Sequence, residues 1–346
     1  MKKFLLALTV LILSISSVFA AGSKEDAALA AAAADRTLTV YSYDTFASDW
    51  GPGPKVIADF EEKTGIKVDL VTGGDAIETF NQIMLEGKDC KADVFLGASD
   101  DMAWKVLEAD ILDSYDSPAL ADIPAALQFD PSNRLLPFDY GVFAFIIDSE
   151  AGVEAPEHLM DLTKPEWKDK TILIDPRTSS VGLGLLLWTH DVLGENYLEW
   201  WSAMKDNMLV MTEGWSSAYT GAFMEGEAPL CISYTTSPIY HVLNEDTTRY
   251  QTVVFPEGHH GTIEGVGIMK GTKHRAEAEE FVDYLLTEAQ LYSAIGNSMY
   301  PVNSAIELDP VYDYAPVPET VYTCDQDFVK SELNNMIRDW VEVMTK

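Results

Sequence analysis

The sequence predicts an α/β protein built from two lobes. Several times along the chain a short strand runs into a polar loop and then an amphipathic helix, which is the βαβ pattern of an open α/β sheet. After residue 36, about 310 residues remain, too many for one ordinary core. The extended run at 136–147 has the length of a strand that passes from one lobe to the other.

The first 20 residues have the three parts of a secretory signal peptide. Lys2 and Lys3 give a positive start, 4–15 is apolar, and small residues suit cleavage near Ala20. The apolar run is too short for a permanent membrane span. We therefore expect an exported, periplasmic protein, with the Ala-rich segment 21–36 as a tether before the first strand.

Composition excludes several classes of partner. The formal net charge of -33 argues against nucleic acid and anionic membranes, and is compatible with a cationic ligand. The chain has three widely spaced cysteines, Cys90, Cys231 and Cys324, and no CxxC motif. One disulfide is possible, but neither a disulfide framework nor a zinc site is expected. No cofactor is expected either.

The first predicted strand, 38–43, ends in a loop at 44–54 that is rich in Pro and Gly. Ligands of open α/β sheets lie beyond the carboxyl ends of strands. Tyr43, Asp44 and Trp50 therefore lie where a ligand is expected. Capping of a turn or helix is the alternative for Asp44.

A second loop, 72–76, precedes a predicted helix at 77–86. The free N–H groups at a helix start suit an anion, so Asp75 and Ala76 mark a possible anion site. Asp75 is also a good N-cap residue, which is the structural alternative.

A stronger anion-site pattern follows the predicted strand at 170–174. A polar turn there leads into an apolar helix that ends near Trp188. Thr178, Ser179 and Ser180 combine hydroxyls with the positive end of that helix, as a phosphate site requires. Simple N-capping is again the alternative.

The stretch 214–241 gathers aromatic residues among hydroxyls: GWSSAYTGAFMEGEAPLCISYTTSPIYH. Trp215, Tyr219, Tyr234 and Tyr240 have few positive charges around them and lie close to predicted strand ends and turns. Ring faces attract cations, and Tyr adds a hydroxyl, so the stretch indicates a pocket for a flat, cationic molecule. Burial of these rings in a core is the alternative.

Six stretches, in this order and spacing, resemble the periplasmic thiamine-binding proteins of bacterial ABC importers, which are solute-binding proteins. The likeness covers roughly residues 38 to 302, without large gaps. The stretches are YSYDTFASDWGPGP, PFDYGVFAF, DPRTSSVGLGLLLW, GWSSAY, SYTTSPIYH and GNSMYPV.

The resemblance implies a two-lobed periplasmic-binding-protein fold of type II, in which each lobe is a mixed sheet flanked by helices. Residues 37–139 and 262–346 would form the first lobe and 140–261 the second, with the ligand in the cleft between them. The implied ligands are thiamine, thiamine monophosphate and thiamine diphosphate. The implied partner is an ABC transporter permease in the inner membrane, and we expect a monomer.

The resemblance also assigns roles to residues. Its phosphate-facing groups fall near Asp75, Ala76 and Ser179. It implies a Trp at the position of Ser298, so a ring that lines the pocket in the family is replaced here by a hydroxyl. That difference bears on the preferred vitamer and not on the fold. The aromatic contacts fall on Tyr43, Trp50, Trp215, Tyr234 and Tyr240.

Two alternatives stay open from the sequence. Related folds bind ferric ion, polyamines or phosphonates; Tyr234 and Tyr240 are suitable ferric ligands, but no His–Asp set adjoins them. Thiamine-degrading transferases also resemble this fold and use a Cys nucleophile, for which Cys231 is the candidate. Its place within a predicted strand favours an inert, buried thiol, so we predict a binding protein and not an enzyme.

Overall fold

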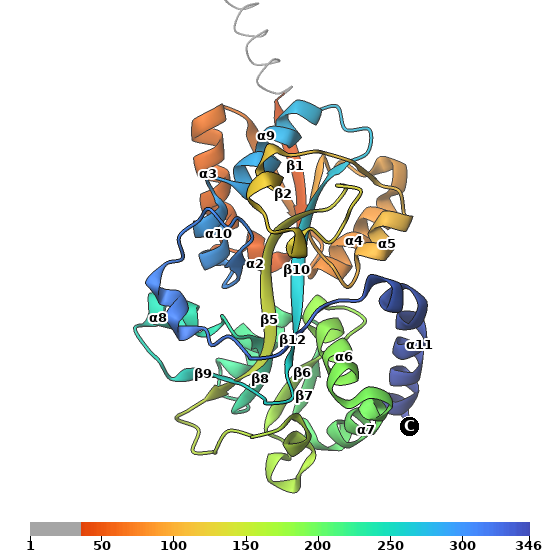
Figure 1. Ribbon diagram of the computed structural model, residues 1–346, viewed down its shortest axis with the longest axis vertical. Helices are drawn as coiled ribbons and strands as arrows, with labels where there is room; N and C mark the ends of the chain where they lie inside the picture. Colours follow the sequence, from red (N-terminus) through yellow and green to blue (C-terminus); the bar gives the residue numbers. More distant parts are fainter. Residues whose placement is uncertain (1–35) are drawn as a thin grey trace, which may run out of the picture.

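The computed structural model describes residues 36–346, and the predicted signal peptide and nearly all of the tether lie outside this range. Figure 1 shows an α/β protein with one lobe above the other. Two long strands, β5 (Leu136–Asp148) and β10 (His259–Met269), run through both lobes. The upper lobe is called the first lobe here and the lower one the second lobe.

The first lobe contains a mixed sheet with the strand order β2-β1-β3-β10-β5. β1 is parallel to β2 and β3, whereas β10 is antiparallel to β3 and β5. Helices cover this sheet, and its core is rich in Phe and β-branched side chains. Its elements are β1 (Thr37–Ser42), α2 (Asp44–Ala47), α3 (Gly53–Thr64), β2 (Lys67–Thr72), α4 (Ala76–Glu86), β3 (Val94–Ser99), α5 (Ala103–Glu108), β4 (Leu112–Asp113), α9 (Arg275–Leu286), α10 (Gln290–Gly296) and β11 (Tyr300–Pro301).

The second lobe has its own mixed sheet, in which β5 lies between β8 and β9. β6 joins β8 and β7 in parallel. α6 is apolar around most of its circumference, and this composition allows it to be buried in the lobe, as its residues 181–189 are. The elements are β6 (Thr171–Ile174), α6 (Ser180–Leu193), α7 (Tyr197–Asn207), β7 (Val210–Thr212), the π-helix η7 (Ser217–Phe223), β8 (Leu230–Tyr234), α8 (Pro238–Glu245) and β9 (Tyr250–Val253).

Short elements fill the remaining connections. They are η1 (Gly87–Asp89), η2 (Pro118–Asp122), η3 (Ala125–Leu127), η4 (Leu159–Thr163), η5 (Pro165–Trp167), η6 (Gly194–Asn196), η8 (Pro310–Tyr314) and β12 (Val321–Tyr322).

β5 confirms the long strand that the sequence predicts. Its first part pairs with β10 up to Val142, and from Phe143 onward it pairs with β8. One strand thus serves both sheets, and the cleft lies where it changes partners. We propose that the lobes divide within β5 and β10 near this point, so the expected boundary at residues 139–140 stays a prediction.

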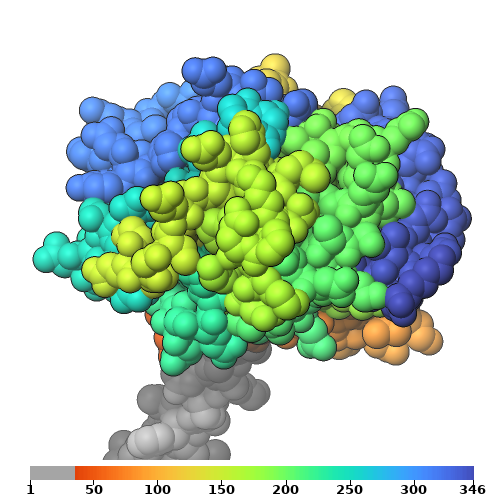
Figure 2. Space-filling model, turned by 90° about the horizontal axis from the view of Figure 1, so that it is seen from below, coloured from red at the N-terminus to blue at the C-terminus, as the bar shows by residue number. Residues whose placement is uncertain are grey.

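The C-terminal helix α11 (Gln326–Thr345) packs on the second lobe. It lies beside α7, and Figure 2 shows it in dark blue along the green helices of that lobe. The sequence-based division placed residues 262–346 in the first lobe, and this helix departs from it. The spacing of its apolar residues defines a buried face but not the partner of that face. The buried side chains are Val329, Leu333, Met336 and Trp340.

Within residues 36–346, none of the helices combines the length and apolar character that crossing a membrane requires.

Candidate ligand-binding cleft

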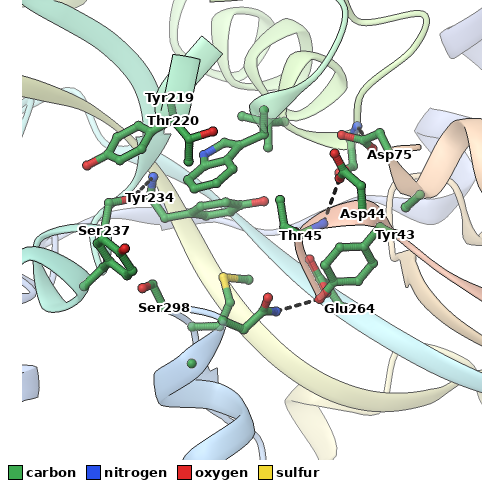
Figure 3. Close-up of a pocket in the computed structure, with 18 of the residues that line it drawn as sticks. Tyr43, Asp44, Thr45, Asp75, Tyr219, Thr220, Tyr234, Ser237, Glu264 and Ser298 are labelled. Carbon is green, nitrogen blue, oxygen red and sulfur yellow. Dashed lines mark hydrogen bonds between the residues drawn. The ribbon is translucent and has the colours of Figure 1, made fainter. Parts of the chain in front are cut away.

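A cavity of about 250 Å³ lies between the lobes. Its lining comes from both lobes and from the segment after α10, and Figure 3 shows the side chains that face it. Two parts of the lining differ in chemistry. One is aromatic and belongs mainly to the second lobe, and the other is acidic and belongs to the first lobe and the connecting strands.

The aromatic wall consists of Trp50, Trp215, Tyr219, Tyr234 and Tyr240. Trp215 stacks on Tyr219 with ring centroids 4.9 Å apart and planes within 10°. Trp50 reaches across from the first lobe, with its ring centroid 6.2 Å from that of Trp215 and 6.3 Å from that of Tyr240. The wall therefore presents ring faces and edges that are already packed against one another.

Hydrogen bonds fix the orientation of the wall. The Trp215 Nε1 donates to Ser233 Oγ at 2.8 Å, and Tyr219 Oη lies 3.0 Å from His241 Nε2. Tyr219 lines the cavity and lies in the π-helix η7, and π-helical turns are frequent at functional sites. A ring held in place loses little freedom when a ligand binds.

The acidic floor consists of the lining residues Tyr43, Glu264 and Asn297 and of Asp139, which is fully buried next to them and does not itself line the cavity. Tyr43 Oη donates to Glu264 Oε2 at 2.7 Å. Asn297 Nδ2 donates to Tyr43 Oη at 2.6 Å and to Asp139 Oδ2 at 2.8 Å, so a chain of hydrogen bonds joins the two carboxyl groups. Gly97 makes room for the Tyr43 ring, because a Cβ there would lie 2.2 Å from Tyr43 Cδ1.

Burial controls the protonation of the floor. Asp139 is 0% exposed and Glu264 is 9% exposed. Burial raises the pKa of Glu264 well above its ordinary value, and the Asp139 carboxylate raises it further. Burial likewise raises the pKa of Asp139, although the hydrogen bond from Asn297 opposes the shift. Among the described residues that line the cavity there is no Lys, Arg or His.

Polar contacts join the lobes across the cavity. Ser179 Oγ donates to Asp75 Oδ2 at 2.8 Å, and the Ser180 backbone N–H donates to Asp75 Oδ1 at 3.1 Å. Ser216 Oγ donates to Asp44 Oδ2 at 2.8 Å. Each contact pairs a carboxylate of the first lobe with donors of the second, so the structure is a closed form.

The predicted phosphate site at the start of α6 is therefore filled by a carboxylate. Asp75 occupies the free N–H group and the hydroxyl that a phosphate would use. Burial raises the pKa of Asp75 to about 6, and its hydrogen bonds to Ser180 and Ser179 oppose the shift. Thr178 does not line the cavity, and its hydroxyl donates to the Glu213 backbone oxygen at 2.6 Å. A phosphate there would have to displace Asp75 or meet it protonated.

The structure brings together most of the residues that the sequence singles out. Thr178 and Ser179 are the exceptions, and neither lines the cavity. Ser179 is fully buried, caps α6 and contacts the cavity through Asp75. Ser298 lines the cavity with φ at +51°, and its backbone oxygen accepts a hydrogen bond from Thr236. The others found in the lining are Tyr43, Asp44, Trp50, Asp75, Ala76, Trp215, Tyr234 and Tyr240.

Sequence reasoning missed further residues of the lining. Glu264 lies within a strand that the sequence shows only as an extended run, so its register with Asp139 was not visible. Asn297 lies in a loop that was recognised only as irregular. The sequence offered one signal for Glu264: an acidic residue in an apolar extended run, next to Gly265 and Gly267. Ser180 and Tyr219, which the sequence patterns include, also line the cavity. The lining residues that sequence reasoning did not name as candidates are Thr45, Val181, Thr220, Met224, Ser237, Glu264, Gly296, Asn297 and Met299.

Cys231 is separate from the cavity. It lies in β8, fully buried and outside the lining, and burial raises the pKa of its thiol well above the ordinary value. A thiol held neutral is a poor nucleophile. Cys90, Cys231 and Cys324 are all free. Among residues 36–346, no group of three or more His, Cys, Asp or Glu side chains is arranged to hold a metal ion.

Fold and cleft together define a protein that encloses a small solute between two lobes. The family model for bacterial extracellular solute-binding proteins matches residues 38–291, and the chain belongs to this family. It is thus a binding protein and not an enzyme.

Individual relatives are more specific. The chain is 34% identical to the thiamine-binding periplasmic protein of Salmonella typhimurium over 92% of its length and 96% of the relative's. It is 34% identical to the Escherichia coli protein of that name, over 89% and 94% of the two chains. A solved structure described as a periplasmic thiamin binding protein superposes with a TM-score of 0.84 at 33% identity, over 90% of this chain and 96% of that one. The two-lobed periplasmic-binding-protein fold is confirmed.

Proposed function

We propose that this protein captures thiamine in the periplasm and delivers it to the permease of an ABC importer. The observation that carries the proposal is the cavity itself, with its aromatic wall, its acidic floor and no basic side chain in its described lining. Thiamine has a flat aminopyrimidine and a permanently charged thiazolium ring. The aromatic wall can stack on the two rings of thiamine, and each cation–π contact with the thiazolium would contribute about 0.5–2 kcal/mol to binding. The acidic floor complements the positive charge of the thiazolium. The names of the relatives support the same ligand.

Periplasmic location follows from the predicted signal peptide and from the relatives, and we propose cleavage near Ala20. The permease is implied by the family. Both sides of the cavity come from a single chain, so the protein is expected to act as a monomer.

Among the vitamers we propose that thiamine binds more tightly than its phosphates. The start of α6 is the place for a phosphate ester, but Asp75 already occupies it. Negative charge beside a carboxylate in a partly closed cavity is unfavourable. Thiamine monophosphate and thiamine diphosphate therefore bind only after Asp75 moves or takes up a proton.

Titration calorimetry tests this proposal. The mature protein is unfolded and refolded to remove bound ligand, and then titrated with thiamine, its two phosphates and choline. We expect thiamine to bind with a Kd of about 1 μM or lower, which corresponds to about -8 kcal/mol. Choline carries the charge without the rings and should bind far more weakly. Absence of heat with all three thiamine compounds would reject the proposal and redirect the search to ferric ion, polyamines and phosphonates.

A further inference from the structure

We propose that Glu264 and Asp139 form a specificity-determining pair that selects organic cations and releases a proton when such a ligand binds. The inference rests on the proposed function and deepens it. The two carboxyl groups belong to the floor, and neither the sequence analysis nor the names of the relatives assign them a role.

The sheet places the two residues side by side. Glu264 of β10 is directly opposite Asp139 of β5. Side chains that face each other in an antiparallel ladder project to the same side, with Cβ atoms about 5 Å apart, and like charges at such positions are destabilising. Two ionised carboxylates in this place are therefore unfavourable unless a proton or a cation lies between or beside them.

An irregularity in the sheet directs Glu264 toward the cavity. The pairing of β10 with β5 shifts directly after Glu264, and the pairing with β3 shifts one residue later. Such bulges turn side chains out of the regular pleat and are frequent beside binding sites. Gly265 permits this local packing, because a Cβ there would lie 2.8 Å from Phe129 Cζ. Glu264 lines the cavity as a result.

The hydrogen bonds of the pair are incomplete. Asp139 Oδ1 is buried and has no hydrogen-bond partner, whereas Oδ2 accepts from Asn297. Glu264 accepts through Oε2 from Tyr43. Buried carboxylate oxygens are normally satisfied. When the cavity is empty, a proton shared by the two carboxyl groups supplies the hydrogen-bond donor that Asp139 Oδ1 lacks. When a cationic ligand is bound, the charge of the ligand takes the place of the charge of that proton.

The groups that face the pair offer no positive charge to replace that proton. Among the described residues, neither Glu264 nor Asp139 forms a salt bridge. The high pKa values of both carboxyls agree with retention of a proton. The titratable groups that interact with the pair from the surrounding elements are Tyr43 after β1, Asp75 before α4, Asp101 after β3, Tyr234 of β8 and Tyr312 of η8.

The proton balance is simple. In the empty protein, one of the two carboxyl groups keeps its proton. When a ligand with a fixed positive charge enters, that carboxyl ionises and its proton passes to the solvent. Glu264, which lines the cavity, then contacts the ligand, and Asp139 acts on the charge from behind the lining. A neutral ligand of the same shape gives no such release. Affinity for the cation therefore rises with pH, by up to about tenfold per pH unit below the pKa of the pair.

Calorimetry in paired buffers tests the inference. Thiamine is titrated at one pH in two buffers with different ionisation enthalpies, and the difference in heat gives the number of protons released. The titrations are repeated between about pH 5.5 and 7.5. We expect release of a proton fraction that grows as the pH falls. Glu264→Gln keeps an acceptor for Tyr43, and Asp139→Asn keeps an acceptor for Asn297.

Each variant removes one carboxyl and its repulsion of the other, so it should reduce the release and weaken thiamine binding about five- to tenfold through loss of one charge. Glu280→Gln, at an exposed position on α9, is the matched control and should behave as the wild type. Tight thiamine binding without proton release in the wild type would overturn the inference and leave the proposed function standing. Unchanged release in both floor variants would also overturn it. Absence of thiamine binding would overturn the proposed function and this inference together.

Discussion

The aromatic wall and the acidic floor face each other across one cavity, yet they are built in different ways. The wall comes mostly from one segment, between Trp215 and Tyr240, and its rings support one another through stacking. The floor is assembled from Tyr43, Asp139, Glu264 and Asn297, which lie far apart in the sequence and meet only through the ladder of β5 and β10 and the loop after α10.

The difference separates affinity from selectivity. Ring contacts gain free energy from any flat molecule of the right size, so the wall supplies affinity with modest discrimination. Buried carboxyls without basic partners are unfavourable in the empty protein and become favourable only beside a positive charge. The floor therefore supplies discrimination, and part of the folding free energy is given up to obtain it. The following predictions test this division, from the largest expected effect to the smallest.

Trp215→Ala should weaken thiamine binding most, by about thirtyfold, or about 2 kcal/mol, because it removes one ring face and loosens Tyr219. Thiamine and choline affinities are compared by calorimetry, and we expect choline to be much less affected. Tyr314→Ala, which removes an aromatic ring that is 48% exposed and outside the cavity, serves as the control. Equal losses for thiamine and choline would contradict a wall that recognises rings.

Asp75→Asn should change the ranking of vitamers. Asn keeps an N-cap acceptor for α4 and an acceptor for Ser179, but it removes the negative charge from the start of α6. We expect the affinity for thiamine monophosphate relative to thiamine to rise about tenfold, or about 1.4 kcal/mol. An unchanged ratio would mean that the phosphate does not bind at this helix start.

Stability should depend on pH through the floor. The folded-state pKa of Asp139 lies above the unfolded one, so the folded state holds more protons and the free energy of unfolding falls as pH rises through the window between them. The pKa of Asp75, raised to about 6, gives a fall in the same direction. Asp139→Asn should match the wild type near pH 4 and be more stable by about 1–2 kcal/mol near pH 8.

Urea unfolding of the ligand-free protein at several pH values measures this effect. Glu280→Gln should follow the wild type throughout. A floor variant that loses stability at high pH would show that the ionised pair is favourable in the empty protein, contrary to the division described above.

Ser298→Ala should have the smallest effect, a change in thiamine affinity of about twofold or less, because it removes one hydroxyl from the lining and no ring or charge. The contact of Ser298 with Thr236 uses the backbone oxygen, which the substitution retains. Calorimetry against thiamine checks this. A large loss would show that the hydroxyl replaces the ring that the family resemblance places there.

Much of the fold was visible in the sequence because local patterns determine it. The alternation of strand, polar loop and helix gave the α/β class, and the uninterrupted run at 136–147 gave the strand shared by both lobes. The second-lobe portion of the wall was also visible, because its rings lie within one stretch. Ser179 was placed in the cavity because a capping hydroxyl and a ligand-binding hydroxyl look alike in sequence.

The carboxyl pair of the floor was not visible in the sequence because strand register brings Glu264 and Asp139 together, whereas Tyr43 was expected at the site from its place at the end of a strand. Glu264 faces Asp139 only because β10 is antiparallel to β5 with a bulge at that point, and one sequence does not fix such a register. The packing of α11 on the second lobe was missed for a related reason: an amphipathic pattern shows that a face is buried but not what covers it.

The most direct test of the central claim is a crystal structure of the complex with thiamine near pH 7. The division of the cavity predicts thiamine rings in contact with Trp215 and Tyr234, and a nitrogen-bearing or charged part of the ligand within hydrogen-bond or ion-pair distance of Glu264. Thiamine bound with no atom within about 4 Å of Glu264, or outside the cavity between the lobes, would contradict the account.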